Sequence, residues 1–92
     1  MDDNAIRAAI FRVLARIAPE ADPAHLAPGE RLRPALDLDS FDFLNLMVGL
    51  KRELGVEVPE ADYGRVGSLG ELVEYLRRRL DAGASNPAEK SA

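Results

Sequence analysis

The stretch DSFDFLNLMVGLKREL, residues 39–54, decides the fold. It places capping residues directly before a strongly apolar run that contains no proline, and Gly55 follows it. This pattern predicts a helix over residues 40–54. At about 100° per residue, five apolar side chains fall within one arc and make a sufficient core face. They are Phe43, Leu46, Met47, Leu50 and Leu54.

A second apolar stripe lies on another flank of the same helix, next to Ser40, and consists of Phe41, Leu44 and Val48. A half-buried helix would carry polar residues there, so this stripe needs its own partner. Either the preceding segment covers it, or it is a docking surface for other proteins. Both hold if Leu44 is partly covered while Phe41 and Val48 stay available.

The segments before this helix are predicted as one helix and one long loop. Apolar residues recur at spacings of three and four from Ile6 to Ile17, which predicts an amphipathic helix over residues 3–18. Four prolines and Gly29 between residues 19 and 34 disfavour regular helix, so residues 19–38 are expected to form a loop. Four leucines can pin that loop across the bundle. They are Leu26, Leu32, Leu36 and Leu38.

The segments after it predict two more helices and a tail. Pro59 suits the first turn of a short helix over 59–64. Ser68 and Glu71 have capping-box spacing before an apolar face, which predicts a helix over 68–81. Residues 82–92 lack large apolar side chains and are expected to be disordered. The expected fold is all-α: a small four-helix bundle in one domain, residues 1–81, with a long loop between its first two helices.

Composition excludes several classes of function. The 92 residues include no cysteine, so disulfides, cysteine-ligated metals and cysteine nucleophiles are ruled out. The net charge is −4, with the acidity concentrated in residues 18–66, which argues against a nucleic-acid partner. The arginines at 77–79 are expected to be a solvated helix end. The N-terminus begins acidic and no apolar run approaches the roughly 20 residues of a membrane span, so a cytoplasmic protein is expected. Nothing in the sequence suggests an obligate dimer, so a monomer is expected.

No catalytic or metal constellation surrounds Ser40. The single histidine, His25, lies in the predicted loop, and no Gly-x-Ser-x-Gly elbow encloses the serine. His25 has no neighbouring ligands at metal spacing, and the acidic residues at 37, 39 and 42 do not match a calcium loop. The sequence therefore predicts neither a hydrolase nor a metal site.

The segment LDLDSFD, residues 36–42, precedes an amphipathic helix and then LGVEVP, residues 54–59. This arrangement resembles the modification region of acyl carrier proteins, whose usual Asp-Ser-Leu reads Asp39-Ser40-Phe41 here. The three-residue motif is weak by itself. Its context is specific, because a helix beginning at the serine, a Val-Glu-Val-Pro exit, a short acidic turn and a capped last helix extend the resemblance over residues 3–80.

The resemblance implies that Ser40 Oγ receives 4′-phosphopantetheine from coenzyme A through a separate, magnesium-using phosphopantetheinyl transferase, to which Asp39 helps present the site. The terminal thiol of the arm would carry acyl groups as thioesters between acyl-loading and acyl-transfer enzymes, and the chain itself would catalyse nothing. Helix electrostatics are consistent with this, because the free N–H groups and positive dipole end at a helix start stabilise a phosphate's negative charge. The stabilisation is about 0.3–1 kcal/mol at an exposed site. Asp39 or Ser40 could also merely cap the helix; having both suggests that Asp39 caps and Ser40 carries.

The chain departs from the family along helix 40–54. Family members in general fatty acid synthesis usually show glutamates there, where this chain has Asn45, Lys51 and Arg52. The two basic residues are also consistent with an ordinary charged helix end. Partners with basic docking patches should bind such a helix less well, so a specialised lipid or secondary-metabolite pathway is expected. Phe41 in place of leucine leaves the choice of transferase open.

Two other functions remain open at this point. An aminoacyl or peptidyl carrier would share the fold and differ only in its cargo. A helical protein-interaction module could keep the carrier shape without ever being modified, and would bind its partner through Phe41, Leu44 and Val48.

Overall fold

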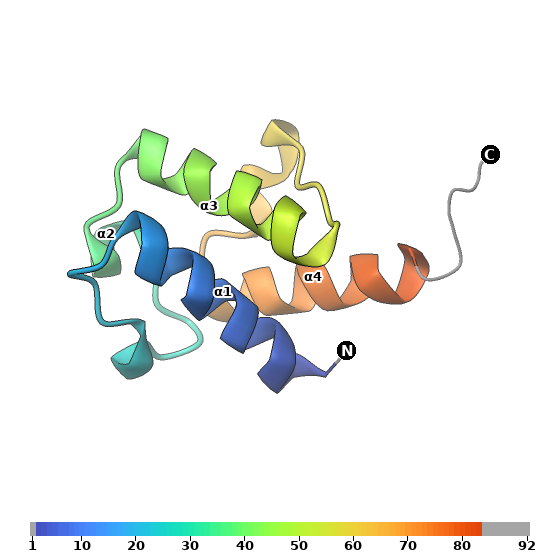
Figure 1. Cartoon of the computed structure of the whole chain (residues 1–92), viewed down its shortest axis with the longest axis horizontal. Coiled ribbons are helices and arrows are strands. Elements are labelled where there is room, and N and C mark those ends of the chain that lie inside the picture. Colours follow the sequence, from blue (N-terminus) through green and yellow to red (C-terminus); the bar gives the residue numbers. More distant parts are fainter. Residues whose placement is uncertain (1, 84–92) are drawn as a thin grey trace.

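A computed structural model describes residues 2–83, which form four α-helices and two short 3₁₀ segments. In chain order these are α1 (Asp3–Ile17), η1 (Pro23–His25), α2 (Leu32–Leu36), α3 (Ser40–Leu54), η2 (Glu60–Arg65) and α4 (Leu69–Gly83). Figure 1 shows α1, α3 and α4 as the long helices, with the short α2 beside the start of α3. The expected all-α class is confirmed. No helix in this part of the chain is long and apolar enough to cross a membrane.

The core lies between α1, α3 and α4, because α1 packs against both of the other long helices. Removing a large aliphatic side chain from water contributes about 1.5–3 kcal/mol, so such a set supplies most of the drive to fold. The core face expected for α3 is confirmed: Phe43, Leu46, Met47 and Leu50 are buried, and Leu54 is half-buried. The other fully buried large side chains are Ile6, Ile10, Val13, Leu14, Leu32, Val66, Leu72 and Leu76.

Gly49 allows α1 and α3 to approach closely. A Cβ atom at this position would overlap the side chain of Val13 on α1. Glycine costs about 1 kcal/mol relative to alanine inside a helix. Here close packing between the two helices compensates for that cost.

The segment between α1 and α3 is not the irregular loop that its prolines predicted. It contains η1 and, from Leu32 to Leu36, the five-residue helix α2. Pro34 is the third residue of α2, within the first turn, where a backbone N–H has no intrahelical acceptor and its loss costs little. The proline count was therefore a poor guide, because proline breaks helix interiors but is accepted at their starts.

This segment is pinned to the bundle as its leucines suggested. Leu32 and Leu38 are buried, while Leu26 and Leu36 are half-buried. The backbone adds two bonds to the start of α4: Leu32 N–H donates to the Gly67 carbonyl at 2.7 Å, and Gly70 N–H donates to the Pro28 carbonyl at 2.8 Å. These bonds fix the position of α2 relative to the start of α4.

The last two elements also differ in detail from expectation. The short helix expected over 59–64 is the 3₁₀ helix η2, which begins one residue after Pro59. The capping box before α4 is present, since Glu71 N–H donates to Ser68 Oγ at 3.2 Å and Ser68 N–H donates to Glu71 Oε1 at 3.1 Å. The helix α4 runs to Gly83, two residues past the expected boundary. The rest of the expected tail lies outside the described residues.

Side chains on α4 hold η2 and α1 in place. The Tyr75 hydroxyl donates to Asp62 Oδ2 at 2.6 Å, and Arg79 lies 3.6 Å from the same carboxylate. Burial and this bond to Asp62 raise the pKa of Tyr75. Arg77 is half-buried and pairs with Asp3 at 3.2 Å. The arginine run is therefore more than the solvated helix end that was expected, because two of its members link α4 to other elements.

Candidate functional site

Ser40 is the first residue of α3, and Asp39 caps the helix. Asp39 Oδ1 accepts a hydrogen bond from Asp42 N–H at 2.8 Å, and Asp42 Oδ2 accepts one from Asp39 N–H at 3.2 Å. This reciprocal capping box satisfies the helix start without the serine. The expectation that Asp39 caps the helix is confirmed. The Ser40 side chain takes no part in the cap.

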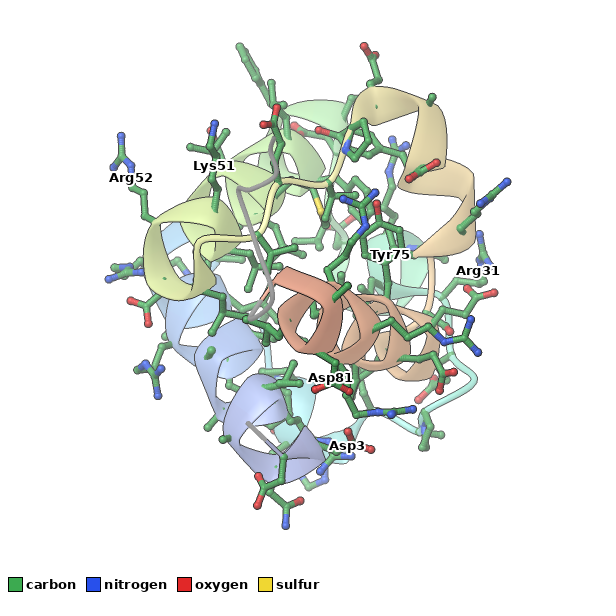
Figure 2. The ribbon with its side chains drawn as sticks, turned by 90° about the vertical axis from the view of Figure 1, so that its right-hand side faces the viewer. Asp3, Arg31, Lys51, Arg52, Tyr75 and Asp81 are labelled. Atoms are coloured by element: carbon green, nitrogen blue, oxygen red, sulfur yellow. The ribbon has the colours of Figure 1, made fainter. Side chains whose placement is uncertain are left out.

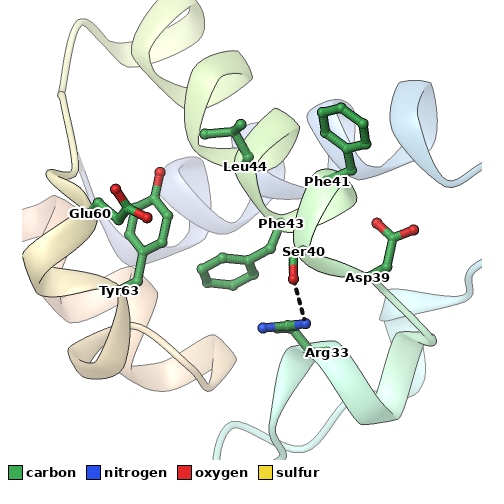
Figure 3. A pocket seen from close by; sticks show the side chains of 8 residues that line it. All are labelled: Arg33, Asp39, Ser40, Phe41, Phe43, Leu44, Glu60 and Tyr63. Carbon is green, nitrogen blue, oxygen red and sulfur yellow. Dashed lines mark hydrogen bonds between the residues drawn. The ribbon is translucent and has the colours of Figure 1, made fainter.

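The Ser40 hydroxyl is exposed, and its one partner within residues 2–83 is the Arg33 guanidinium. Arg33 Nη2 donates to Ser40 Oγ at 3.1 Å (Figure 3). A hydroxyl oxygen has two lone pairs and one proton. One lone pair is used here, so the other lone pair and the proton remain available to a visiting enzyme.

Arg33 was missed by the sequence analysis, because seven residues and a change of chain direction separate it from Ser40. The turn that returns the chain is set by Asp37, which adopts the left-handed conformation at φ 56°. Leu38 N–H then donates to the Arg33 carbonyl at 2.8 Å. Aspartate tolerates this conformation better than most residues. The sequence feature that could have indicated the turn is therefore Asp37 as the residue that ends a short helix.

A pocket of about 600 Å³ opens beside Ser40, between the start of α3 and η2 (Figure 3). The rings of Phe43 and Tyr63 meet edge to face in it, with centroids 5.4 Å apart. Burial, and to a lesser extent the carboxylates of Glu60 and Glu57, raise the pKa of Tyr63, which keeps its phenol neutral. The lining residues are Arg33, Asp39, Ser40, Phe41, Phe43, Leu44, Glu60 and Tyr63.

Three of those lining residues have roles that the sequence analysis did not find. Phe43 was assigned to the core alone, although its ring also lines the pocket. Glu60 and Tyr63 were assigned only to a short helix. Their part in the pocket depends on where η2 lies relative to α3, and no local sequence pattern reports that placement.

The second apolar stripe of α3 is open to solvent. Phe41 is 73% exposed, Leu44 42% and Val48 44%. The interpretation that the preceding segment covers this flank is therefore wrong. Leu44 contributes to the pocket, and Phe41 projects outward next to Ser40 (Figure 3). A contiguous apolar surface lies directly beside the hydroxyl.

Charge changes sign along α3. Asp39 and Asp42 lie at its start, while Lys51 and Arg52 project from its last turn (Figure 2). Lys51 lies 3.5 Å from Glu57, a long and exposed ion pair. Such a pair contributes little to stability. The charges at the two ends of α3 are therefore available to any protein that binds along it.

His25 lies in η1 and does not line the pocket beside Ser40. His25 is exposed and lies 3.1 Å from Asp22. Within residues 2–83, no group of three or more histidine, aspartate or glutamate side chains is arranged to hold a metal ion.

The sequence matches the family described as "Phosphopantetheine attachment site" over residues 5–76, which covers most of the chain. The chain belongs to the acyl carrier protein family. Among its relatives, the acyl carrier protein of Thermotoga maritima is 29% identical over 79 residues, which cover 83% of this chain and 98% of that protein. The acyl carrier protein of Lactobacillus johnsonii is 40% identical over 42 residues, 46% of this chain and 52% of that protein.

A mitochondrial relative is longer than this chain. The putative mitochondrial acyl carrier protein of Schizosaccharomyces pombe is 23% identical over 73 residues, which cover 79% of this chain and 65% of that protein. The chain thus spans slightly less than two thirds of that acyl carrier protein and nearly all of the bacterial one from Thermotoga maritima.

Membership of the acyl carrier protein family implies a covalently attached 4′-phosphopantetheine. The residues around Ser40 fit such a group. The hydroxyl is exposed, a guanidinium lies within hydrogen-bonding distance, and a pocket opens alongside. The first-turn N–H groups of Ser40 and Phe41 have no acceptor within the helix, which also favours a phosphate.

Proposed function

We propose that Ser40 Oγ is the attachment point of the 4′-phosphopantetheine arm, and that the chain carries acyl groups on it and presents them to partner enzymes. The observation that carries this proposal is the exposed Ser40 hydroxyl at the start of α3, beside a helix cap that does not need it. When bound, the arm supplies a terminal thiol that holds acyl groups as thioesters. The chain has no cysteine that could do this.

Attachment requires a separate phosphopantetheinyl transferase with magnesium. The bond formed joins Ser40 Oγ to the phosphorus that bears the pantetheine, and the bond broken is the pyrophosphate linkage of coenzyme A. Adenosine 3′,5′-bisphosphate leaves, and the hydroxyl proton passes to a base on the transferase. Asp39 fixes the turn that presents the hydroxyl, and its exposed carboxylate is the recognition element that we assign to the transferase.

Partner enzymes dock, in this proposal, on the apolar surface formed by Phe41, Leu44 and Val48. Its support is position: the three side chains are 73%, 42% and 44% exposed and follow Ser40 along α3. An enzyme that acts on the arm must come close to Ser40. A few residues supply most of the affinity in such interfaces and aromatic side chains are enriched there, so Phe41 is expected to contribute more than Leu44 or Val48.

The partners belong to a specialised lipid or secondary-metabolite pathway. The support is the sign change along α3, since Lys51 and Arg52 oppose any partner that presents basic residues along the whole helix. Loading by enzymes of general fatty acid synthesis should then be poor. Efficient loading and elongation by such enzymes would contradict the specialised assignment. The cytoplasmic, monomeric state expected from the sequence stays a prediction.

The test is intact-mass measurement after incubation with coenzyme A, magnesium and several broad-specificity transferases. The wild-type chain should gain the mass of one phosphopantetheine, and Ser40→Ala should gain none. Ser85→Ala, which removes a serine far along the sequence, is the matched control and should be modified like wild type. An unchanged wild-type mass with every transferase would favour the unmodified interaction module. A modified chain that accepts only aminoacyl groups would be a peptidyl-type carrier.

A further inference from the structure

Two features near Ser40 have opposite effects on a phosphate: the free N–H groups at the start of α3 favour it, and nearby carboxylates disfavour it. Asp39 and Asp42 place two carboxylates in the first turn of α3, next to the hydroxyl. A phosphodiester on Oγ would add a negative charge beside them, and like charges at this separation repel. The group that offsets this repulsion comes from α2. It is the Arg33 guanidinium, 3.1 Å from Oγ.

Among the described residues, Arg33 differs from most other arginines in that no carboxylate pairs with it. Arg12 and Arg16 share Glu53, and Arg31 reaches Glu71 at 3.4 Å. Within residues 2–83, the bonds of Arg33 go to Ser40 Oγ and, at a long 3.5 Å, to the Leu38 carbonyl. A guanidinium has five N–H donors in a planar fork that suits phosphate oxygens. Most of those donors are therefore free at the position where a phosphate would be attached.

We propose that Arg33 is the phosphate-binding residue of this carrier, which pairs with the phosphodiester of the arm on Ser40 and positions the start of the arm beside the pocket. This inference rests on the proposed function. The non-bridging oxygens of a phosphate on Oγ lie one bond beyond that oxygen, so Arg33 Nη2 can exchange the hydroxyl for one of them by a small side-chain movement.

The fold holds Arg33 ready for this role. The left-handed Asp37 and the bond from Leu38 N–H to the Arg33 carbonyl fix the end of α2 next to the start of α3. Arg33 and Ser40 line the same pocket as Phe43 and Tyr63 (Figure 3). A phosphate held between the two would therefore start the arm at the edge of that pocket. Arg33 acts as a positioning residue, because it touches the attachment group and not the cargo.

A direct test uses phosphoserine incorporated genetically at position 40, which places a phosphate on Oγ without any transferase. The second pKa of phosphoserine is about 6 and can be followed by ³¹P NMR. With Arg33 present, that pKa should be lower by about half a pH unit or more than in the Arg33→Ala variant. Arg33→Lys should restore part of the difference, and added salt should reduce it.

Arg31→Ala is the matched control, because it removes the same charge two residues away from a side chain that pairs with Glu71. Its phosphoserine pKa should equal that of the otherwise wild-type chain. Equal pKa values with and without Arg33 would overturn the proposal. Should Arg33→Ala fold poorly, Arg33→Gln keeps the shape of the side chain and removes its charge.

A second measurement uses the arm itself. In ¹H–¹⁵N spectra the Arg33 Nε–H resonance should move when Ser40 is modified, and that of Arg31 should not. The two proposals can fail separately. Modification of wild type without an Arg33 effect on the phosphoserine pKa removes the role of Arg33 and leaves the carrier function. An Arg33 effect on phosphoserine in a chain that no transferase modifies leaves the phosphate site and removes the carrier function.

Discussion

Helix α3 has two apolar faces that differ in what covers them. One face, with Phe43, Leu46 and Leu50, is buried against the bundle. The other, with Phe41, Leu44 and Val48, contains side chains of the same kinds and remains open to solvent. Hydrophobic character therefore does not decide burial by itself. What packs against α3 decides it, because α1 contacts this helix while the face with Phe41, Leu44 and Val48 is left exposed.

The open face is the one next to Ser40. An exposed apolar surface of this kind often marks a site where another protein binds. The buried face maintains the fold, while the open face has no structural task that the described contacts reveal. Substitutions on the two faces should separate stability from recognition, and the following predictions are ordered by expected effect.

The largest effect should come from truncating one leucine on each face. Leu46→Ala leaves a cavity in the core and should reduce the free energy of unfolding by about 2–5 kcal/mol. Leu44→Ala, which removes the same atoms from the 42% exposed Leu44, should cost less than about 1 kcal/mol. Urea unfolding followed by circular dichroism measures both. Similar losses for the two variants would show that the open face is structural after all.

Phe41→Ala should affect recognition more than folding. We expect kcat/KM for the transferase that modifies wild type to fall by a factor of about 5 to 30, as for the loss of an aromatic contact worth about 1–2 kcal/mol. The free energy of unfolding should change by less than about 0.5 kcal/mol. Arg78→Ala, an exposed change on α4, is the control and should leave both values unaltered. Wild-type kinetics in Phe41→Ala would argue against a docking role.

Gly49→Ala tests how closely the covered side of α3 approaches α1. The new methyl group overlaps Val13, and overpacking of this kind costs about 1–3 kcal/mol, offset by about 1 kcal/mol of helix propensity. A net loss of about 1 kcal/mol in urea unfolding is expected. Adding Val13→Ala should make the Gly49→Ala change less costly than it is in the wild-type background. A stabilised single variant would show that the two helices separate easily.

The smallest effect concerns Glu53, at the polar edge of the covered face. Hydrogen bonds from Arg12 and then Arg16 lower the pKa of Glu53 below its usual value of 4.5. Because the folded-state pKa is lowered, the stabilisation is present above pH 4.5 and is lost as the pH falls through the folded-state pKa. Near neutral pH, the Glu53→Gln variant should therefore have a lower urea midpoint of unfolding than wild type.

The gap between wild type and Glu53→Gln should close as the solution is acidified, and it should also shrink in high salt. Urea midpoints measured across pH and salt concentration check both trends. A gap that persists well below pH 4.5 would mean that packing of the Glu53 side chain, and not its charge, is what stabilises the fold.

Local patterns in the sequence were enough to predict the helix over 40–54, its core face and the cap that leaves Ser40 in the first turn. The start of α4 was equally predictable, from the capping box of Ser68 and Glu71. These features depend on residues within one or two helical turns of each other. Periodicity and capping spacing encode such features directly.

Contacts between distant segments decided the rest. The placement of Arg33 at Ser40, of Tyr63 in the pocket and of Val13 against Gly49 depends on how separate elements pack. The helix α2 accepts Pro34 because this residue lies in its first turn, and the bond from Leu32 N–H to the Gly67 carbonyl ties the helix to the start of α4. The sequence by itself determined which helix carries the serine. Only the tertiary structure decided which side of that helix stays open and which cation stands beside the hydroxyl, because burial and charge pairing are set by neighbours far away in the chain.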